Sequence, residues 1–125
     1  MARPRVLGVE CARLARPVRD EWARLATEGT PGQRKDAQAK LKGLRTLEAR
    51  IVANPLAAGD SLERRLWPAC VRTDYGDMPN LTRFELAGYW RGLYVLAGEA
   101  DGVRAWILYL WDHPTYDRHM GFRKR

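Results

Sequence analysis

The sequence is poor in the residues that build disulfide frameworks and metal centres. Its 125 residues include only two cysteines and two histidines. Cys11 and Cys70 are far apart and match neither a zinc-binding nor a thiol-redox spacing, so we expect two free thiols in a reducing compartment. His113 and His119 are too far apart to share one face of a single helix, which argues against a metal held by both. We therefore predict neither a disulfide nor a metal site.

Long apolar runs and the common nucleotide and nucleophile motifs are also missing. No apolar run follows the first arginines, and none elsewhere is long enough to span a bilayer. We therefore expect a cytoplasmic protein with no signal peptide and no membrane partner. No glycine-rich loop could cradle a nucleotide phosphate, and no serine or cysteine lies in a recognisable nucleophile motif. These absences argue against the usual covalent-nucleophile enzymes, and we predict no cofactor.

Positive charge, in contrast, is abundant and unevenly spread. The formal net charge is +7 and the sequence pI is about 9.9. Residues 1–50 carry 12 Lys/Arg against 6 Asp/Glu, residues 51–111 carry 6 against 7, and residues 112–125 carry 4 against 2. A small basic domain often binds nucleic acid, an anionic membrane or an acidic protein. The charge places such a contact at the N-terminal third or the C-terminal tail.

The hydrophobic pattern predicts an α+β fold in one domain over residues 1–125. An apolar run over 6–12 suits a first strand, and Pro17 opens a first helix. A second helix covers 31–53, with apolar residues on one stripe at a 3.6-residue period. A long connection follows, in which Trp67-Pro68 starts another short strand. Three strand-like runs joined by two turn signals then predict an antiparallel meander; they cover residues 81–86, 89–97 and 103–111.

Arg91 interrupts a run that otherwise has the pattern of a buried central strand. An unpaired guanidinium is costly to bury, so Arg91 needs a partner or a ligand. Strand alternation puts Arg83 and Glu85 of the preceding strand on the same face. Two interpretations stay open. The group holds a phosphate, for which arginine is well suited, or Arg91 and Glu85 form a structural ion pair across neighbouring strands.

His113 and Tyr116 follow the last strand and are three residues apart, so they can lie together on one helical turn. Histidine exchanges protons near neutral pH, and Asp112 can orient its imidazole. The alternative is an ordinary turn leaving the strand, in which Asp112 is the cap and Pro114 fixes the φ angle.

Basic residues lie on the second helix and in the C-terminal tail. Lys42 and Arg45 belong to the polar side of that helix, which is either a solvated surface or a docking face for RNA or an acidic partner. The tail either contacts RNA phosphates without reading sequence or is a frayed basic terminus. Its basic residues are Arg118, Arg123, Lys124 and Arg125.

Taken together, these segments resemble the RelE/ParE superfamily of type II toxin–antitoxin toxins. The resemblance rests on the runs NLTRFEL, GYWRGLYVL and ILYLWDHPTYDRHMGFRKR, with the motifs WR-x-x-Y and DH-x-x-YDR-x-x-G-[FY]-R-K-R. As motif it covers residues 80–125, and as an order of strand, two helices and sheet it covers most of the chain. The connection over 67–80 is longer than the common family pattern.

The resemblance implies a small twisted antiparallel sheet with two N-terminal helices packed on one face. In the RelE-like branch it implies metal-independent mRNA cleavage, usually on the ribosome, by attack of a ribose 2′-hydroxyl on the adjacent phosphate. Arg91 would steady the phosphate charge, and Arg83 would be the basic residue of the preceding strand. His113 would act as general acid and Tyr116 would stack on or orient a base. Glu85 would be a candidate general base.

Resemblance in fold leaves the activity open. The ParE branch inhibits DNA gyrase without cleaving RNA, and a degenerate member would only bind RNA or a protein. Toxins of this superfamily are usually neutralised by an antitoxin. The basic faces of residues 31–50 and 118–125 would suit an acidic partner of that kind.

Overall fold

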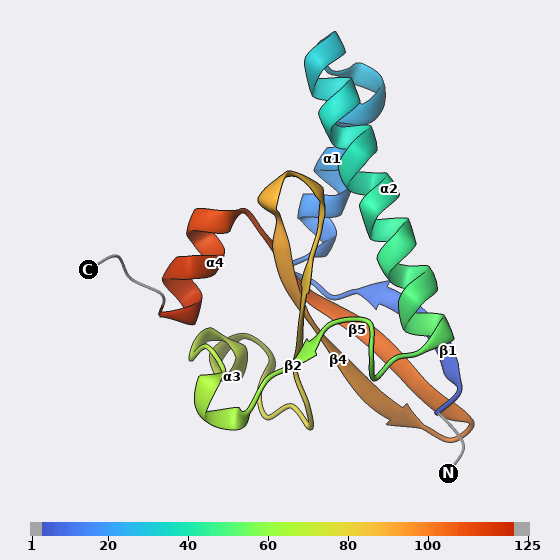
Figure 1. Cartoon of the computed structure of the whole chain (residues 1–125), viewed down its shortest axis with the longest axis vertical. Coiled ribbons are helices and arrows are strands. Elements are labelled where there is room, and N and C mark those ends of the chain that lie inside the picture. The colour runs from blue at the N-terminus through green and yellow to red at the C-terminus, as the bar shows by residue number, and fades with distance from the viewer. Residues whose placement is uncertain (1–3, 122–125) are drawn as a thin grey trace.

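The computed structural model describes residues 4–121, which form a five-stranded sheet with helices on both faces (Figure 1). Helices α1 and α2 cover one face, whereas α3 and α4 lie on the other. The elements in chain order are β1 (Val6–Cys11), α1 (Arg16–Glu28), α2 (Pro31–Ala53), β2 (Asp60–Ser61), the 3₁₀ turn η1 (Arg64–Leu66), α3 (Cys70–Tyr75), β3 (Thr82–Glu85), the 3₁₀ turn η2 (Ala87–Tyr89), β4 (Arg91–Glu99), β5 (Gly102–Trp111) and α4 (His113–Met120).

The sheet is mixed, with the strand order β1-β5-β4-β3-β2. Strands β3 to β5 pair antiparallel, as the meander predicts, and the short strand β2, which was not predicted, adds antiparallel to β3. Strand β1, in contrast, pairs parallel with β5. The prediction of a wholly antiparallel sheet is therefore wrong at this edge. A six-residue strand shows a similar pattern beside either kind of neighbour, and the α1–α2 hairpin sets its direction here by carrying the chain over one face. The α+β class and the two N-terminal helices on one face are confirmed.

Helix α2 has the bounds that its sequence signals predict. Thr30 caps its start: its hydroxyl accepts from the Gln33 backbone N–H at 3.2 Å, and the Gln33 side chain accepts from the Thr30 N–H at 2.9 Å. This reciprocal pair satisfies two helix-end donors. Lys40, although close to the apolar stripe, pairs with Asp36 at 2.7 Å and has its ammonium 4.9 Å from the centre of the Trp90 ring. Both contacts keep its charge stabilised at a side chain that is only 14% exposed.

The segment before β3 differs from its prediction. Trp67 ends the turn η1 and the chain then enters α3, so no strand starts at Trp67-Pro68. The cause is local, because the Pro68 carbonyl accepts from the Val71 N–H at 3.2 Å and the chain turns at once. Trp67, Val71 and Tyr75 pack this segment onto the sheet.

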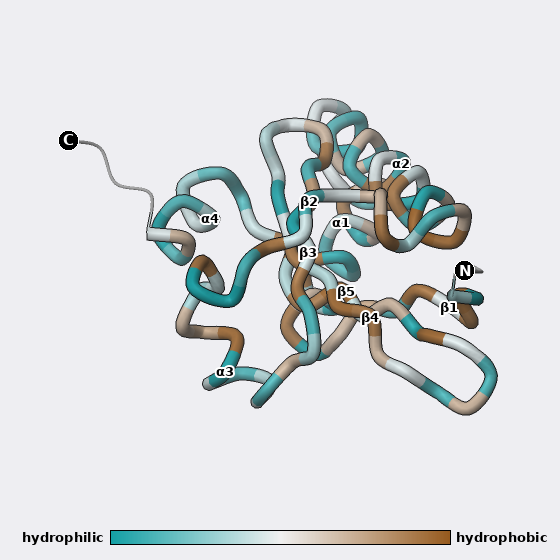
Figure 2. Tube along the Cα trace, turned by 60° about the horizontal axis from the view of Figure 1, so that its bottom comes forward, coloured by the Kyte–Doolittle hydropathy of each residue, from teal (hydrophilic) through white to brown (hydrophobic). Residues whose placement is uncertain are grey.

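Two apolar clusters sandwich the sheet, and the central strands β4 and β5 contribute to both. Figure 2 shows hydrophobic stretches of the trace along these two strands. Under α1 and α2 lie Phe84, Tyr94 and Ile107. The opposite face buries Leu93 together with Val71 of α3. The pairing of β4 with β5 contains a register shift. Leu93 pairs with Tyr109 and Tyr94 pairs with Ile107, so Leu108 is an extra residue in β5. This bulge puts the side chains of Leu108 and Tyr109, although consecutive, into the same cluster.

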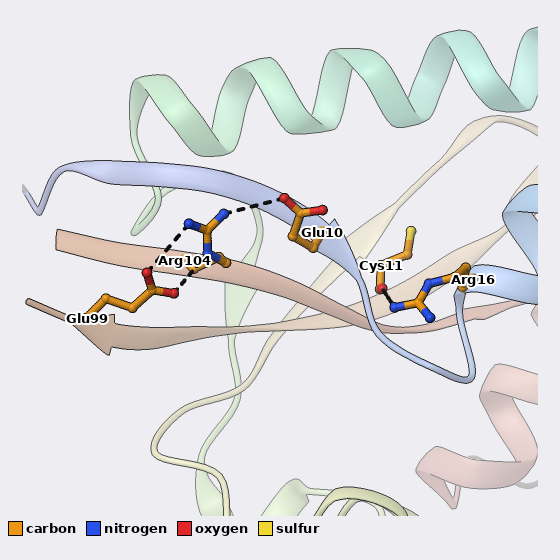
Figure 3. Close-up of polar contacts among 5 residues, drawn as sticks. All are labelled: Glu10, Cys11, Arg16, Glu99 and Arg104. Atoms are coloured by element: carbon orange, nitrogen blue, oxygen red, sulfur yellow. Dashed lines mark hydrogen bonds and ion pairs between the residues drawn. The ribbon is translucent and has the colours of Figure 1, made fainter. Parts of the chain in front are cut away.

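Arg104, the charged residue within β5, is tied to both strands beside it (Figure 3). Its guanidinium donates to Glu99 of β4 at 2.8 Å and lies 3.4 Å from the carboxylate of Glu10 of β1. Arg16 binds the Cys11 carbonyl at 3.1 Å where β1 leads into α1. The Arg104 contacts hold the parallel edge strand to the meander, and the Arg16 contact holds the turn from β1 into α1.

Candidate functional site

Arg91 and Glu85 face each other across β4 and β3, on the side of the sheet that α4 partly covers. Their side chains form an ion pair of 3.3 Å, in which Arg91 is 18% exposed and Glu85 is 61% exposed. The guanidinium carbon of Arg91 also lies 5.7 Å from the centre of the Tyr116 ring. The predicted cross-strand pair is therefore present, and an aromatic ring from another element adds to it.

Arg83 lies two residues before Glu85 in β3, on the same face of the sheet. Its Nε is 3.0 Å from the Asp60 carboxylate of β2, and its Nη1 donates to the Tyr116 hydroxyl at 3.2 Å. The bond to Tyr116, and then the Asp60 carboxylate, hold the pKa of Arg83 above its ordinary value. Tyr116 thus contacts both arginines, with its ring on one and its hydroxyl on the other.

Helix α4 sets the position of Tyr116. The Asp112 carboxylate accepts from the Thr115 N–H at 2.9 Å, and this bond lowers the pKa of Asp112. Asp112 is therefore a helix cap, as in the turn interpretation, and no contact joins it to the imidazole of His113 among the described residues. The helix ends at Gly121, whose φ of 78° suits glycine. Tyr116 turns onto the sheet and is only 1% exposed.

His113 lies at the Arg91 end of this site. Its side chain is 46% exposed and its Nε2 is 3.5 Å from the Asp117 carboxylate on the next turn of α4. Its ring centre lies 6.4 Å from that of Tyr89, which precedes Arg91 by two residues. Tyr89 is 75% exposed and has a φ of 62°, the left-handed region that a bulky residue seldom adopts. The two predicted residues of α4 therefore differ: Tyr116 is buried between the arginines, and His113 faces solvent.

A pocket of ≈ 380 Å³ opens beside Arg83 and Tyr116. It is bounded by the segment of residues 62–69 and by the last turn of α4, which contributes His119. The His119 ring stacks on Trp111 at 4.5 Å with an angle of 13° between the planes. His119 was not among the predicted site residues. The signal that could have found it is its spacing of three from Tyr116, which places both on one side of a helix.

The predicted basic residues are spread over several surfaces. Lys42 and Arg45 are both exposed on α2, and Lys42 lines a groove that also contains Glu85. Arg118 is exposed on α4. Arg123, Lys124 and Arg125 lie outside the described residues. The structure therefore brings together Arg83, Arg91, Glu85 and Tyr116, with His113 at one side, and it keeps Arg45 apart from them.

Comparison of the chain with protein-family models, with curated proteins and with solved structures finds no match. Within residues 4–121, no cluster of three or more histidine, cysteine or acidic side chains could hold a metal ion. None of the helices in that part of the chain has the length and apolar character needed to cross a bilayer.

Proposed function

We propose that this protein is a RelE-like toxin of a type II toxin–antitoxin system, and that it cleaves mRNA in the cytoplasm without a metal. The observation that carries the proposal is the pair of arginines on adjacent strands that share Tyr116 from the C-terminal helix. Two preorganised guanidinium groups on one face form a site for a phosphodiester, and they gain most where negative charge grows in the transition state.

The reaction that fits these residues is transfer of the phosphate within the RNA. The 2′-oxygen of one nucleotide forms a bond to phosphorus, the bond to the 5′-oxygen of the next nucleotide breaks, and a 2′,3′-cyclic phosphate and a 5′-hydroxyl result. Arg91 and Arg83 hold the phosphate, and Tyr116 fixes both guanidinium groups. Glu85, displaced from Arg91 by the phosphate, accepts the proton of the 2′-hydroxyl. His113 gives a proton to the leaving 5′-oxygen.

The arrangement of the chain supports the same proposal. A strand and a two-helix hairpin precede the antiparallel strands β3 to β5, which is the order that the resemblance to the superfamily implies. The exposed Lys42 and Arg45 of α2 and Arg118 of α4 offer surfaces for an acidic antitoxin segment or for ribosomal RNA. The tail residues Arg123, Lys124 and Arg125 would add to the contact with ribosomal RNA.

One observation favours a second candidate, a non-catalytic member of the same fold. Such a member would either inhibit DNA gyrase or only bind RNA or protein. Both arginines of the site already have carboxylate partners, because Arg83 pairs with Asp60 and Arg91 pairs with Glu85. An ion-paired arginine serves a structural role equally well. RNA must therefore displace at least one carboxylate in the nuclease.

Transcript mapping after controlled expression separates these functions. The nuclease predicts growth arrest and new mRNA ends, both lost in Arg91→Ala and His113→Ala. Purified protein that leaves mRNA intact on translating ribosomes would refute it. Growth arrest with DNA damage, intact transcripts and tolerance of His113→Ala would favour gyrase inhibition, and unimpeded growth would favour a binding protein.

A further inference from the structure

The pocket beside Arg83 extends away from the arginine pair and shares only Arg83 with it. Arg83 and Tyr116 line the pocket and are joined by the hydrogen bond of 3.2 Å. The volume of ≈ 380 Å³ lies within the roughly 300–1,000 Å³ typical of small-molecule sites. Two further side chains with nitrogen donors, Arg65 and His119, also line it. An anion held by the arginines would therefore be adjacent to a cavity of ligand size.

Two walls of this pocket are aromatic rings that other contacts hold in place. The Trp67 indole donates to the Leu62 carbonyl at 2.9 Å, and the Arg64 guanidinium carbon lies 4.6 Å from the centre of a Trp67 ring. His119 stacks on Trp111, which keeps its imidazole in one orientation. Fixed aromatic walls favour a flat heterocycle, because stacking costs little conformational entropy when the rings are already ordered.

We infer that this pocket binds one nucleobase of a single-stranded RNA whose phosphate lies on Arg83 and Arg91. A nucleotide matches both parts of the site, since it joins a flat base to an anion over a short distance. Arg65, which also lines the pocket, can hydrogen-bond to the edge of the base, which gives the pocket a means to select among the four bases.

The position of His113 sets the direction of the RNA strand, and this step rests on the proposed function. His113 is the first residue of α4 and lies at the Arg91 end of the site, whereas the last turn of α4 borders the pocket. If His113 protonates the leaving 5′-oxygen, the nucleotide that carries this oxygen lies at the Arg91 end. The nucleotide that carries the attacking 2′-hydroxyl then places its base in the pocket. The pocket therefore selects the nucleotide immediately before the cut.

The test measures binding of the four nucleoside 3′-monophosphates to the full chain by NMR titration. In these probes the phosphate occupies the place of the scissile phosphate. We expect at least one of them to bind tenfold or more tightly than its 5′ isomer and than inorganic phosphate. Leu66 lines the pocket and is 43% exposed, so Leu66→Trp should fill the pocket without unfolding the protein. This variant should bind the 3′-nucleotide at least tenfold more weakly and inorganic phosphate unchanged.

Leu56→Trp is the matched control, because Leu56 is 68% exposed and is not part of the pocket lining. Equal binding of the 3′-nucleotide by wild type and Leu66→Trp overturns the inference, and a preference for the 5′ isomer overturns the strand direction. Nucleotide binding that depends on Leu66 in a protein that cleaves no RNA would refute the nuclease and leave the pocket. RNA cleavage whose base preference is the same in Leu66→Trp as in wild type would support the nuclease and refute the base-binding pocket.

Discussion

Under the proposed nuclease mechanism, replacing Glu85 with glutamine should move RNA binding and RNA cleavage in opposite directions. Glutamine keeps the shape of the side chain but removes the charge that now pairs with Arg91 at 3.3 Å. Because Glu85 is 61% exposed, the ion pair contributes at most about 1 kcal/mol to folding stability. A carboxylate about 5–7 Å from a bound phosphate repels it by about 0.6–0.8 kcal/mol in a water-like dielectric. We therefore expect the dissociation constant for RNA to fall roughly threefold.

Cleavage should respond in the other direction, since the variant has no carboxylate to accept the proton of the 2′-hydroxyl. Loss of a general base typically slows the chemical step by about 10²–10⁴-fold. Fluorescence anisotropy with a short oligoribonucleotide measures the affinity, and single-turnover cleavage measures the rate. Glu21→Gln is the control for net charge, because Glu21 is also an exposed carboxylate, 51% exposed, and pairs with Arg24 on α1 at 2.7 Å.

Two outcomes would contradict this account. RNA affinity that changes no more than in Glu21→Gln would mean that the Glu85 carboxylate does not oppose binding of the phosphate. A parallel fall in affinity, cleavage and urea-denaturation midpoint would mean that the pair mainly supports the fold.

Four further substitutions test the packing, the helix cap and the hydrogen bonding of the structure. Gly92→Ala should destabilise the protein by about 3 kcal/mol, since a β-carbon there would lie 2.3 Å from the Phe84 ring. Gly43→Ala, where the nearest atom would lie 3.7 Å from the new β-carbon, should instead stabilise α2 by about 0.5–1 kcal/mol. Urea denaturation measures both free energies of unfolding, and equal effects of the two substitutions would contradict the packing. Asp112→Asn should match wild type at neutral pH, because asparagine also caps helices. The lowered pKa of Asp112 means that its contribution is present above about pH 4 and is lost as pH falls through the lowered pKa, so wild type should lose more stability than the variant between pH 5 and pH 2. Tyr116→Phe removes the acceptor for one arginine while keeping the ring beside the other; it should cost about 1 kcal/mol of stability, and no change in the denaturation midpoint would count against that hydrogen bond.

Strand alternation and helix capping predicted the parts of the molecule that depend on neighbouring residues. The bounds of α2 follow from Thr30, Pro31 and the stripe of apolar residues, and these local signals agree with one another. The shared face of Arg83, Glu85 and Arg91 follows from alternation in two short strands with a clean register. In these segments no distant contact overrides the local preference.

The other side of the site depends on contacts that no local pattern contains. The bulge at Leu108 shifts the side-chain alternation of β5, so Trp111 lies on the same face as Arg91, with which it pairs, while Ile107 stays under the helices. The residues of β4 and β5 around the bulge are apolar on both faces, and the sequence therefore gives no sign of the extra residue. The spacing of three from Tyr116 places His119 on the same side of α4, but the stacking of His119 on Trp111 depends on this shift in β5. The parallel pairing of β1 likewise depends on how the helices return the chain.

The position of β1 also bears on how the protein folds. Val6 and Val103 are neighbours in the sheet although almost the whole chain lies between them. Closing so long a loop is entropically costly, so we expect this pairing to form late, after the β3–β5 meander. Until then the backbone groups along one side of β5 remain unpaired and can accept the first strand of another copy. Refolding at high concentration would thus favour strand-exchanged dimers, which makes the chain's first strand the place where assembly and misassembly compete.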